Sequence, residues 1–214
     1  MRSGDYIARC GVEGDDSWTL TASGLKLVYL RPEVESICLD DIAQHLSMLC
    51  RFTGAVSQFY SVAQHSVFVG ALVKQVLDDE GVDRGVDYWD QILAALLHDA
   101  EETYTNDLAS PLKSCIRGKY KWIASGIERK VFERYGIDWD YRNALVKACD
   151  NKAIIVERFY FMPEHPDWPK VSVEEMEYPK PRLMEHDEAK LIFTNTVRAA
   201  LKVRNALLAE VNGA

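Results

Sequence analysis

His98 and Asp99, two residues of types that can bind metal ions, stand next to each other directly after the apolar run at positions 93–97, and the carboxylates Glu101 and Glu102 follow them. An imidazole nitrogen and a carboxylate oxygen are both ligands of divalent transition metals. A mononuclear metal site takes roughly four ligands. We therefore expect other segments of the chain to bring further ligands to this point.

Two residues elsewhere in the chain suit the remaining ligand positions. His65 lies in the first turn of an apolar segment that begins after Ser61, a good helix N-cap. Asp150 lies inside a core-facing helical pattern, where burial of a lone carboxylate is costly unless a cation such as a metal ion compensates it. Pairing with Lys147 or Arg158 explains Asp150 equally well, and a lone histidine is more often a surface or hydrogen-bonded core residue than a ligand.

The other three histidines fit no metal site. His186 and Asp187 form a second His-Asp pair, but they lie between a proline-rich stretch and a polar helix start, where an N-cap role explains Asp187. His165 is flanked by polar residues and proline and is expected in a solvated loop, and His45 is expected on a helix surface. An adjacent His-Asp pair is therefore weak evidence for a metal site on its own.

Residues 1–35 differ in pattern from the rest of the chain. Residues 17–21 and 26–30 have the composition of short strands that pair across a Ser-Gly turn. Asp40 and Asp41 then suit the N-cap of a first helix. The sequence thus predicts an N-terminal hairpin ahead of a helical domain.

Helices are expected to position the candidate ligands. Apolar residues at helical spacing predict helices over the following ranges: about 62–77, 87–102, 112–135, 141–162 and 188–210. A continuous helix over 87–102 would make His98 and Glu102 neighbours one turn apart. Residues 163–181 hold five of the seven prolines, so a loop is expected over 163–187.

Composition excludes several classes of protein. A chain of 214 residues is expected to form one domain, because each half alone would bury a marginal core. A net charge of −8 argues against a nucleic-acid partner, which would require a basic face. The five cysteines are widely spaced without a CxxC motif, which predicts reduced thiols in a cytoplasm. The polar first five residues predict no secretory signal, and no apolar run has the length of a membrane span.

The ordered set His65, His98, Asp99 and Asp150 resembles the H…HD…D signature of the HD-domain phosphohydrolases. The resemblance implies an all-α HD-domain helical bundle over the single domain 1–214, with the N-terminal β-hairpin as an extension. It also implies that these four residues bind one divalent transition metal, namely Co, Mn, Zn, Fe or Ni. An additional Mg²⁺ on the phosphates of a substrate is compatible with such a site.

The sequence around the signature narrows the resemblance. Residues 60–66, 97–102 and 107–113 resemble the bacterial and phage branch that contains the 5′-deoxynucleotidases and the dATP triphosphohydrolases. The similarity runs from about residue 21 to residue 162 and covers most of the chain.

The same resemblance implies roles for five further residues. Glu102, three residues after the HD aspartate, would orient the attacking water, and Asp107 would assist it. Lys113 ends a D-L-x-x-P-x-K segment and, together with Arg51 and Phe52, would contact the substrate. Arg51 and Phe52 depart from the family pattern, because the family has Trp in place of Phe and a spacing to the first histidine that differs by about one residue.

Three functions follow from the resemblance. The leading expectation is a dNTP triphosphohydrolase of the dATP type, which releases the deoxynucleoside and tripolyphosphate; the basic residues Arg117, Lys119 and Lys121 after Lys113 favour it. The alternatives are a 5′-deoxynucleotidase acting on dNMPs and, more distantly, a non-catalytic nucleotide-binding regulator. A cytoplasmic homo-oligomer of a bacterium or phage-infected host is implied, with a small deoxynucleotide as partner and neither nucleic acid nor membrane.

Overall fold

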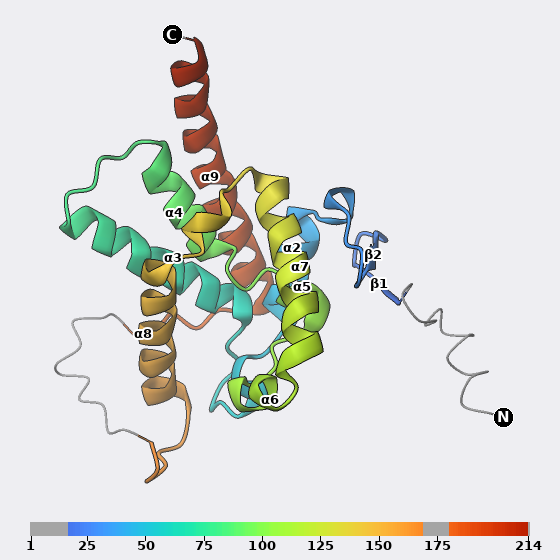
Figure 1. Cartoon of the computed structure of the whole chain (residues 1–214). Helices are drawn as coiled ribbons and strands as arrows, with labels where there is room; N and C mark the ends of the chain where they lie inside the picture. The colour runs from blue at the N-terminus through green and yellow to red at the C-terminus, as the bar shows by residue number, and fades with distance from the viewer. Residues whose placement is uncertain (1–16, 169–179, 214) are drawn as a thin grey trace.

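The computed structural model describes residues 17–168 and 180–213, without the side chain of Arg117. Within these ranges the chain is mostly helical, with a short antiparallel hairpin near the N-terminus, as the sequence predicts (Figure 1). Residues 1–16 of the expected N-terminal extension and residues 169–179 of the expected proline-rich loop lie outside the described residues. None of the described helices is both long enough and apolar enough to cross a bilayer.

The predicted hairpin is present and is tied to the first described helix. Strands β1 (Trp18–Leu20) and β2 (Lys26–Val28) pair across a turn that contains Gly24, whose φ of 86° suits glycine. Helix α2 (Leu39–Met48) has Cys38 as its N-cap, so the prediction of Asp40 or Asp41 as the cap is wrong. The reason is that the Asp41 carboxylate accepts hydrogen bonds from the backbone N–H and the hydroxyl of Ser23 in the hairpin turn, each at 2.7 Å.

Helices α3 (Val62–Asp79) and α4 (Val86–Leu96) form the centre of the fold. The predicted N-cap Ser61 opens α3 in a reciprocal capping box with Gln64. The two helices approach closely at Gly70, where an added Cβ would lie 2.7 Å from Leu96 Cδ2. Glycine is therefore required here for its lack of a side chain rather than for its backbone freedom.

The predicted helix over 87–102 is wrong at its C-terminal end. Helix α4 ends at Leu96, residues 97–101 form a turn, and the one-turn helix α5 (Glu102–Thr105) follows. His98 and Glu102 are consequently not neighbours on a continuous helix. The turn places the His-Asp pair in a non-helical segment between two helix ends.

The second half of the chain follows the predicted order with shifted boundaries. The expected helix over 112–135 is two helices, α6 (Ser110–Cys115) and α7 (Arg117–Tyr135), because Ile116 leaves the helical region with φ −110° and ψ 21°. Gly136 ends α7 with a φ of 63°, so the helix stops at Tyr135, where the predicted range also ends. Helix α8 (Ala144–Phe161) begins at the N-cap Asn143 rather than at residue 141.

The C-terminal helix α9 (His186–Gly213) is longer than the predicted 188–210. At its N-terminus the N–H of Ala189 donates to the carbonyl of Glu185. The predicted N-cap Asp187 therefore lies inside the first turn. Helix α9 packs on α2, α3 and α4, and its C-terminal part extends away from the other helices (Figure 1).

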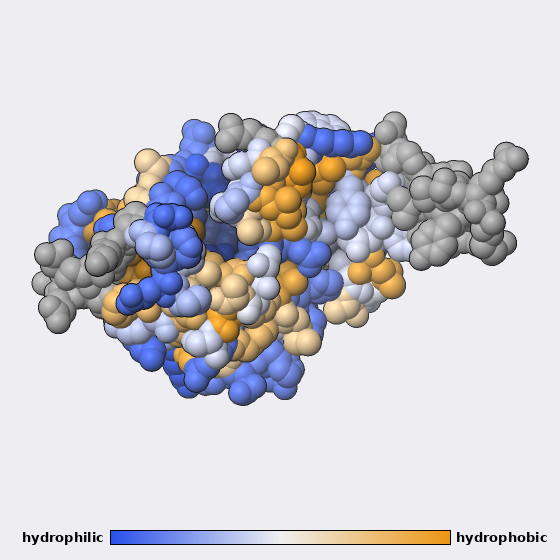
Figure 2. All heavy atoms as spheres, turned by 90° about the horizontal axis from the view of Figure 1, so that it is seen from below, coloured by the Kyte–Doolittle hydropathy of each residue, from blue (hydrophilic) through white to orange (hydrophobic). Residues whose placement is uncertain are grey.

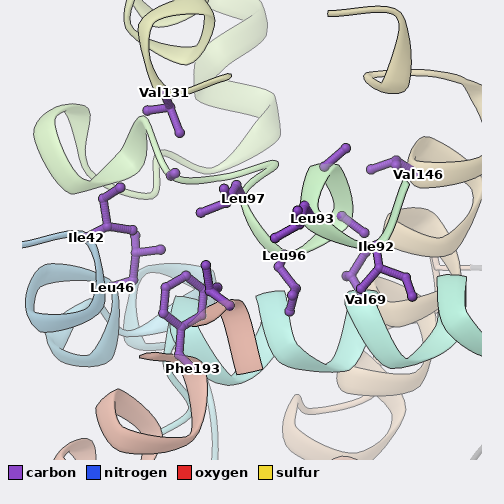
Figure 3. Close-up of a cluster of buried hydrophobic side chains, with 14 of the residues drawn as sticks. Ile42, Leu46, Val69, Ile92, Leu93, Leu96, Leu97, Val131, Val146 and Phe193 are labelled. Atoms are coloured by element: carbon purple, nitrogen blue, oxygen red, sulfur yellow. The ribbon is translucent and has the colours of Figure 1, made fainter. Parts of the chain in front are cut away.

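Side chains from seven helices, α2, α3, α4, α5, α7, α8 and α9, meet in one core, part of which is shown in Figure 3. Leu96 and Leu97 of the α4 end lie among residues of α2, α3, α7 and α9, and both are almost fully buried. The turn that carries His98 and Asp99 therefore leaves directly from the packed core, which fixes its position.

Candidate metal centre

The side chain of His98 is held by the end of helix α4. The last carbonyl groups of a helix have no partner within it, and His98 Nδ1 donates to one of them, the carbonyl of Ala95, at 2.7 Å. This bond leaves the other ring nitrogen, Nε2, without a proton when the imidazole is neutral. His98 Nε2 is buried and has no hydrogen-bond partner.

His65 has the same arrangement on helix α3. Its Nδ1 lies 2.7 Å from a carboxylate oxygen of Glu157, and its Nε2 is buried without a hydrogen-bond partner. Burial and the Arg51 guanidinium lower the pKa of His65, but the Glu157 and Asp150 carboxylates outweigh them and raise the pKa to about 9. Two buried imidazole nitrogens that lack partners are costly in a protein interior unless a ligand satisfies them.

Both Nε2 atoms point toward the carboxylates of Asp99 and Asp150. Asp99 Oδ2 lies 3.1 Å from His98 Nε2 and 3.5 Å from His65 Nε2. Asp150 Oδ1 lies 3.3 Å from His65 Nε2 and 4.0 Å from His98 Nε2. The structure thus brings together all four residues that the sequence suggests as ligands.

These separations fit ligands of one metal ion. Adjacent donor atoms about 2.1 Å from an ion lie about 3.0 Å apart in octahedral geometry, which leaves positions open for water, and about 3.4 Å apart in tetrahedral geometry; the observed distances are close to these values. His65, His98 and Asp99 form a group that can hold a metal ion. The chemistry of the donors agrees, because two neutral imidazoles and two carboxylates suit Zn, Mn, Fe, Co or Ni.

The electrostatics of the site keep the two aspartates ionised. Burial raises the pKa of Asp99, but its neighbours His98, His65 and Arg51 hold the pKa well below its usual range. The pKa of Asp150 is also lowered, against its own burial, by the adjacent imidazoles of His65 and His98. Asp150 makes the predicted pair with Lys147 as well, at 2.7 Å between Nζ and Oδ2. Its other oxygen faces the histidines, so the ion pair and the ligand role are compatible.

The predicted catalytic acid Glu102 lies beside the four candidate ligands. One of its carboxylate oxygens is within 4.8 Å of an oxygen of Asp99. Its Oε1 accepts a hydrogen bond from Lys113 Nζ at 2.7 Å, whereas Oε2 is buried without a partner. Burial, together with the negative charges of Asp99 and Asp107, raises the pKa of Glu102 well above its usual range.

The predicted substrate contact Arg51 lies next to this group. Its NH1 is 3.7 Å from Asp99 and 3.6 Å from Asp107, which brings the second predicted acid to the site as well. Arg51 is buried, and the half-buried Phe52 ring lies 5.3 Å from its guanidinium. Lys113 is partly exposed beside Glu102.

Unusual backbone conformations flank these residues. Among the described non-glycine residues, Phe52 and Thr53 next to Arg51 and Asn106 next to Asp107 have a positive φ. Such conformations cost on the order of 1–3 kcal/mol each and occur often where a side chain must be held for function. They give the Arg51 turn and the Asp107 loop a defined shape.

Some residues of the site are absent from the predictions. Glu157 lies fully buried under His65, and Tyr60 OH donates to it at 2.9 Å. The signal was present in the sequence, because Glu157 stands seven residues after Asp150, on the same face of one helix, among core residues. A second buried acid, Glu101, has an Oε2 without a partner, and the resemblance assigns no role to it.

The remaining histidines lie elsewhere, as expected. His186 and Asp187 are both exposed at the start of α9, His165 is exposed in the loop, and His45 Nε2 accepts from the backbone N–H of Ala22. The face seen in Figure 2 is hollowed between the ends of α8 and α6. The floor of this hollow is hydrophilic, and hydrophobic surface lies beside it.

Comparison with known proteins places the chain in a family. It is 37% identical over 142 residues to the uncharacterized protein YfdR of Escherichia coli (strain K12), an alignment that covers 66% of this chain and 71% of YfdR. The chain belongs to the YfdR family. A more distant relative, an uncharacterized protein of Rhodobacter capsulatus, is 32% identical over 123 residues, which cover 56% of this chain and 59% of that protein. No family model matches the sequence.

Proposed function

We propose that this member of the YfdR family is a metal-dependent phosphohydrolase of the HD-domain type that acts on deoxynucleotides. The observation that carries the proposal is the pair of buried, partnerless Nε2 atoms of His65 and His98, which converge on the carboxylates of Asp99 and Asp150. The order of these four residues along the chain is that of the H…HD…D signature.

The proposed chemistry is attack of a water molecule on the phosphorus next to the sugar, which breaks the bond from that phosphorus to the 5′-oxygen and releases the deoxynucleoside, whose 5′-oxygen takes up a proton. A divalent metal held by the four ligands would polarise a phosphoryl oxygen and lower the pKa of water from about 15.7 toward 7. Glu102 lies within reach of Asp99 and has one carboxylate oxygen free to orient the water and take its proton. Lys113 holds the other oxygen of Glu102 and so fixes the direction of the free one.

Two cations are placed to receive the phosphate. Arg51 presents a planar guanidinium between Asp99 and Asp107, and such a group binds phosphate oxygens in pairs. Lys113 is the more exposed cation and would bind as a point charge. Asp107 would keep Arg51 turned toward the ligand group, which is how we propose that it assists the reaction.

The length of the phosphate chain separates two candidate activities. We propose a dNTP triphosphohydrolase first, with Lys119 and Lys121, both exposed on α7, available to a polyphosphate. A 5′-deoxynucleotidase is the second candidate, and one observation favours it. Arg51, Lys113 and Lys147 are each already paired with a carboxylate, so a highly charged triphosphate would need Mg²⁺ as an additional counter-ion.

The test is incubation of the protein with dAMP, dATP, AMP and ATP in the presence of Mn²⁺ or Co²⁺, followed by chromatography of the products. Tripolyphosphate with deoxyadenosine identifies the triphosphohydrolase, and inorganic phosphate from dAMP identifies the nucleotidase. Turnover that disappears in Asp99→Ala supports the proposed site. No turnover of these or other deoxynucleotides would contradict the proposal and favour a nucleotide-binding regulator.

A further inference from the structure

We propose that Glu157 is a positioning residue that connects the metal ligand His65 to the phosphate-facing Arg51 through one buried carboxylate. The inference rests on the proposed function, because both partners are part of the proposed site. It assigns to Glu157 an influence on metal affinity and on the placement of Arg51 that goes beyond holding helices together.

The contacts of Glu157 account for both of its carboxylate oxygens. Oε1 lies 2.7 Å from His65 Nδ1 and accepts from Tyr60 OH at 2.9 Å. Oε2 accepts from Arg51 NH2 at 3.3 Å. The carboxylate has no exposed surface, so no water competes for these positions. Each partner is consequently held in one orientation by the same group.

The bond to His65 decides which ring nitrogen is free. When a carboxylate accepts from Nδ1–H, the lone pair of a neutral imidazole is on Nε2, and the charge of the carboxylate makes that nitrogen a stronger donor to a metal. His98 depends on the neutral carbonyl of Ala95 for the same purpose. His65 is therefore the ligand whose strength depends on a charged partner.

The bond to Arg51 decides where its free donors point. NH2 faces Glu157, whereas NH1 faces Asp99 and Asp107. A guanidinium is planar and rigid, so fixing NH2 on one side also fixes NH1 on the side of the ligand group. Helix α8 thereby contributes one ligand at Asp150 and, two turns later, the residue that positions another ligand and the cation.

The experiment compares metal affinity in four proteins. Glu157→Gln removes the charge but keeps an oxygen that can accept from His65, and Tyr60→Phe removes one donor to Glu157 without altering either proposed partner. Asp90→Asn is the matched control, because Asp90 is a buried carboxylate that faces Arg204, 3.5 Å away, between α4 and α9. Each protein is freed of metal, checked for its unfolding temperature, and titrated with Zn²⁺ against a competing chelator.

We expect the Zn²⁺ dissociation constant to rise about 10- to 100-fold in Glu157→Gln, as for other removed partners of a metal-bound histidine. It should rise less in Tyr60→Phe and remain unchanged in Asp90→Asn. In the Zn²⁺-loaded protein with ¹⁵N-labelled histidine, the Nδ1–H signal of His65 should exchange slowly with water in the control and be broadened or lost in Glu157→Gln. With a phosphoester substrate, Glu157→Gln should also raise KM through the misplaced Arg51.

Equal Zn²⁺ affinity and an unchanged His65 signal in Glu157→Gln, with normal binding in the unaltered protein, would overturn the inference and leave the proposed function standing. Failure of the unaltered protein to bind Zn²⁺ would instead contradict the proposed function itself. If Glu157→Gln does not fold, Tyr60→Phe decides the matter, because a purely structural Glu157 predicts the same Zn²⁺ affinity for Tyr60→Phe as for Asp90→Asn.

Discussion

Metal binding to this protein should release a proton from His65 at neutral pH. The pKa of His65 is about 9 in the metal-free protein, because the Glu157 and Asp150 carboxylates favour its charged form. A metal ion binds only the neutral imidazole. Between pH 7 and 8.5, one proton and one metal ion therefore compete for His65 Nε2.

The size of the pH effect on the metal dissociation constant follows from the pKa of His65. Competition weakens the apparent affinity by a factor of about 100 at pH 7 and about 4 at pH 8.5, so the dissociation constant should fall about 25-fold over this range. In the metal-free protein the stability of the fold, unlike the metal affinity, decreases as pH rises. His65 has a folded-state pKa of about 9 and an unfolded value near 6.5. Its contribution, on the order of 3 kcal/mol, is complete below pH 6.5 and is lost as pH rises through 9.

The assay is calorimetric titration with Zn²⁺ or Co²⁺ at each pH, repeated in buffers that differ in ionisation enthalpy so that released protons are counted. About one proton per metal ion is expected from His65 at pH 7, and fewer at pH 8.5. Thermal unfolding at the same pH values should show the metal-free protein becoming less stable as pH rises. An affinity that does not change between pH 7 and 8.5, with no proton released, would refute the proposed role of His65.

Three further changes have defined outcomes. Asp99→Ala should lose both metal and hydrolysis, since it removes a charged ligand; metal analysis together with a turnover assay checks this, and normal turnover would rule the residue out as a ligand. Glu102→Ala should keep its metal but lose most of its rate, about 10²- to 10⁴-fold, and loss of the metal would show Glu102 to be a ligand instead. Gly70→Ala should destabilise the protein by about 1–3 kcal/mol because its Cβ would meet Leu96 Cδ2; denaturant unfolding measures it, and an unchanged midpoint would show that the α3–α4 contact yields.

Helix order was predictable because apolar periodicity and local caps are encoded within single segments. Ser61 and Gly136 each act on the neighbouring few residues, and the structure places helix ends at both. Boundaries that depend on distant contacts were not predictable. Asp41 does not cap α2, because its carboxylate accepts a hydrogen bond from Ser23, 18 positions earlier in the chain.

The proximity of His65, His98, Asp99 and Asp150 was expected from the resemblance to the H…HD…D signature. Residue type and context alone left a hydrogen-bonded core role open for His65 and an ion pair open for Asp150. The turn that bears His98 was not predictable, because the apolar run before it reads as uninterrupted helix. Glu157 was missed because a glutamate on a helix is ordinarily exposed, although its spacing of seven residues from Asp150 places it on the same face of α8.

Metal-dependent turnover of a deoxynucleotide tests the central proposal most directly. The protein is freed of metal with a chelator, and hydrolysis of dATP and of dAMP is followed while Mn²⁺ or Co²⁺ is added in fractions of one equivalent per chain. We predict no hydrolysis without metal and a rate that rises with added metal up to about one equivalent. Hydrolysis that persists in the fully metal-free protein, or its absence with both substrates at saturating metal, would contradict the proposal.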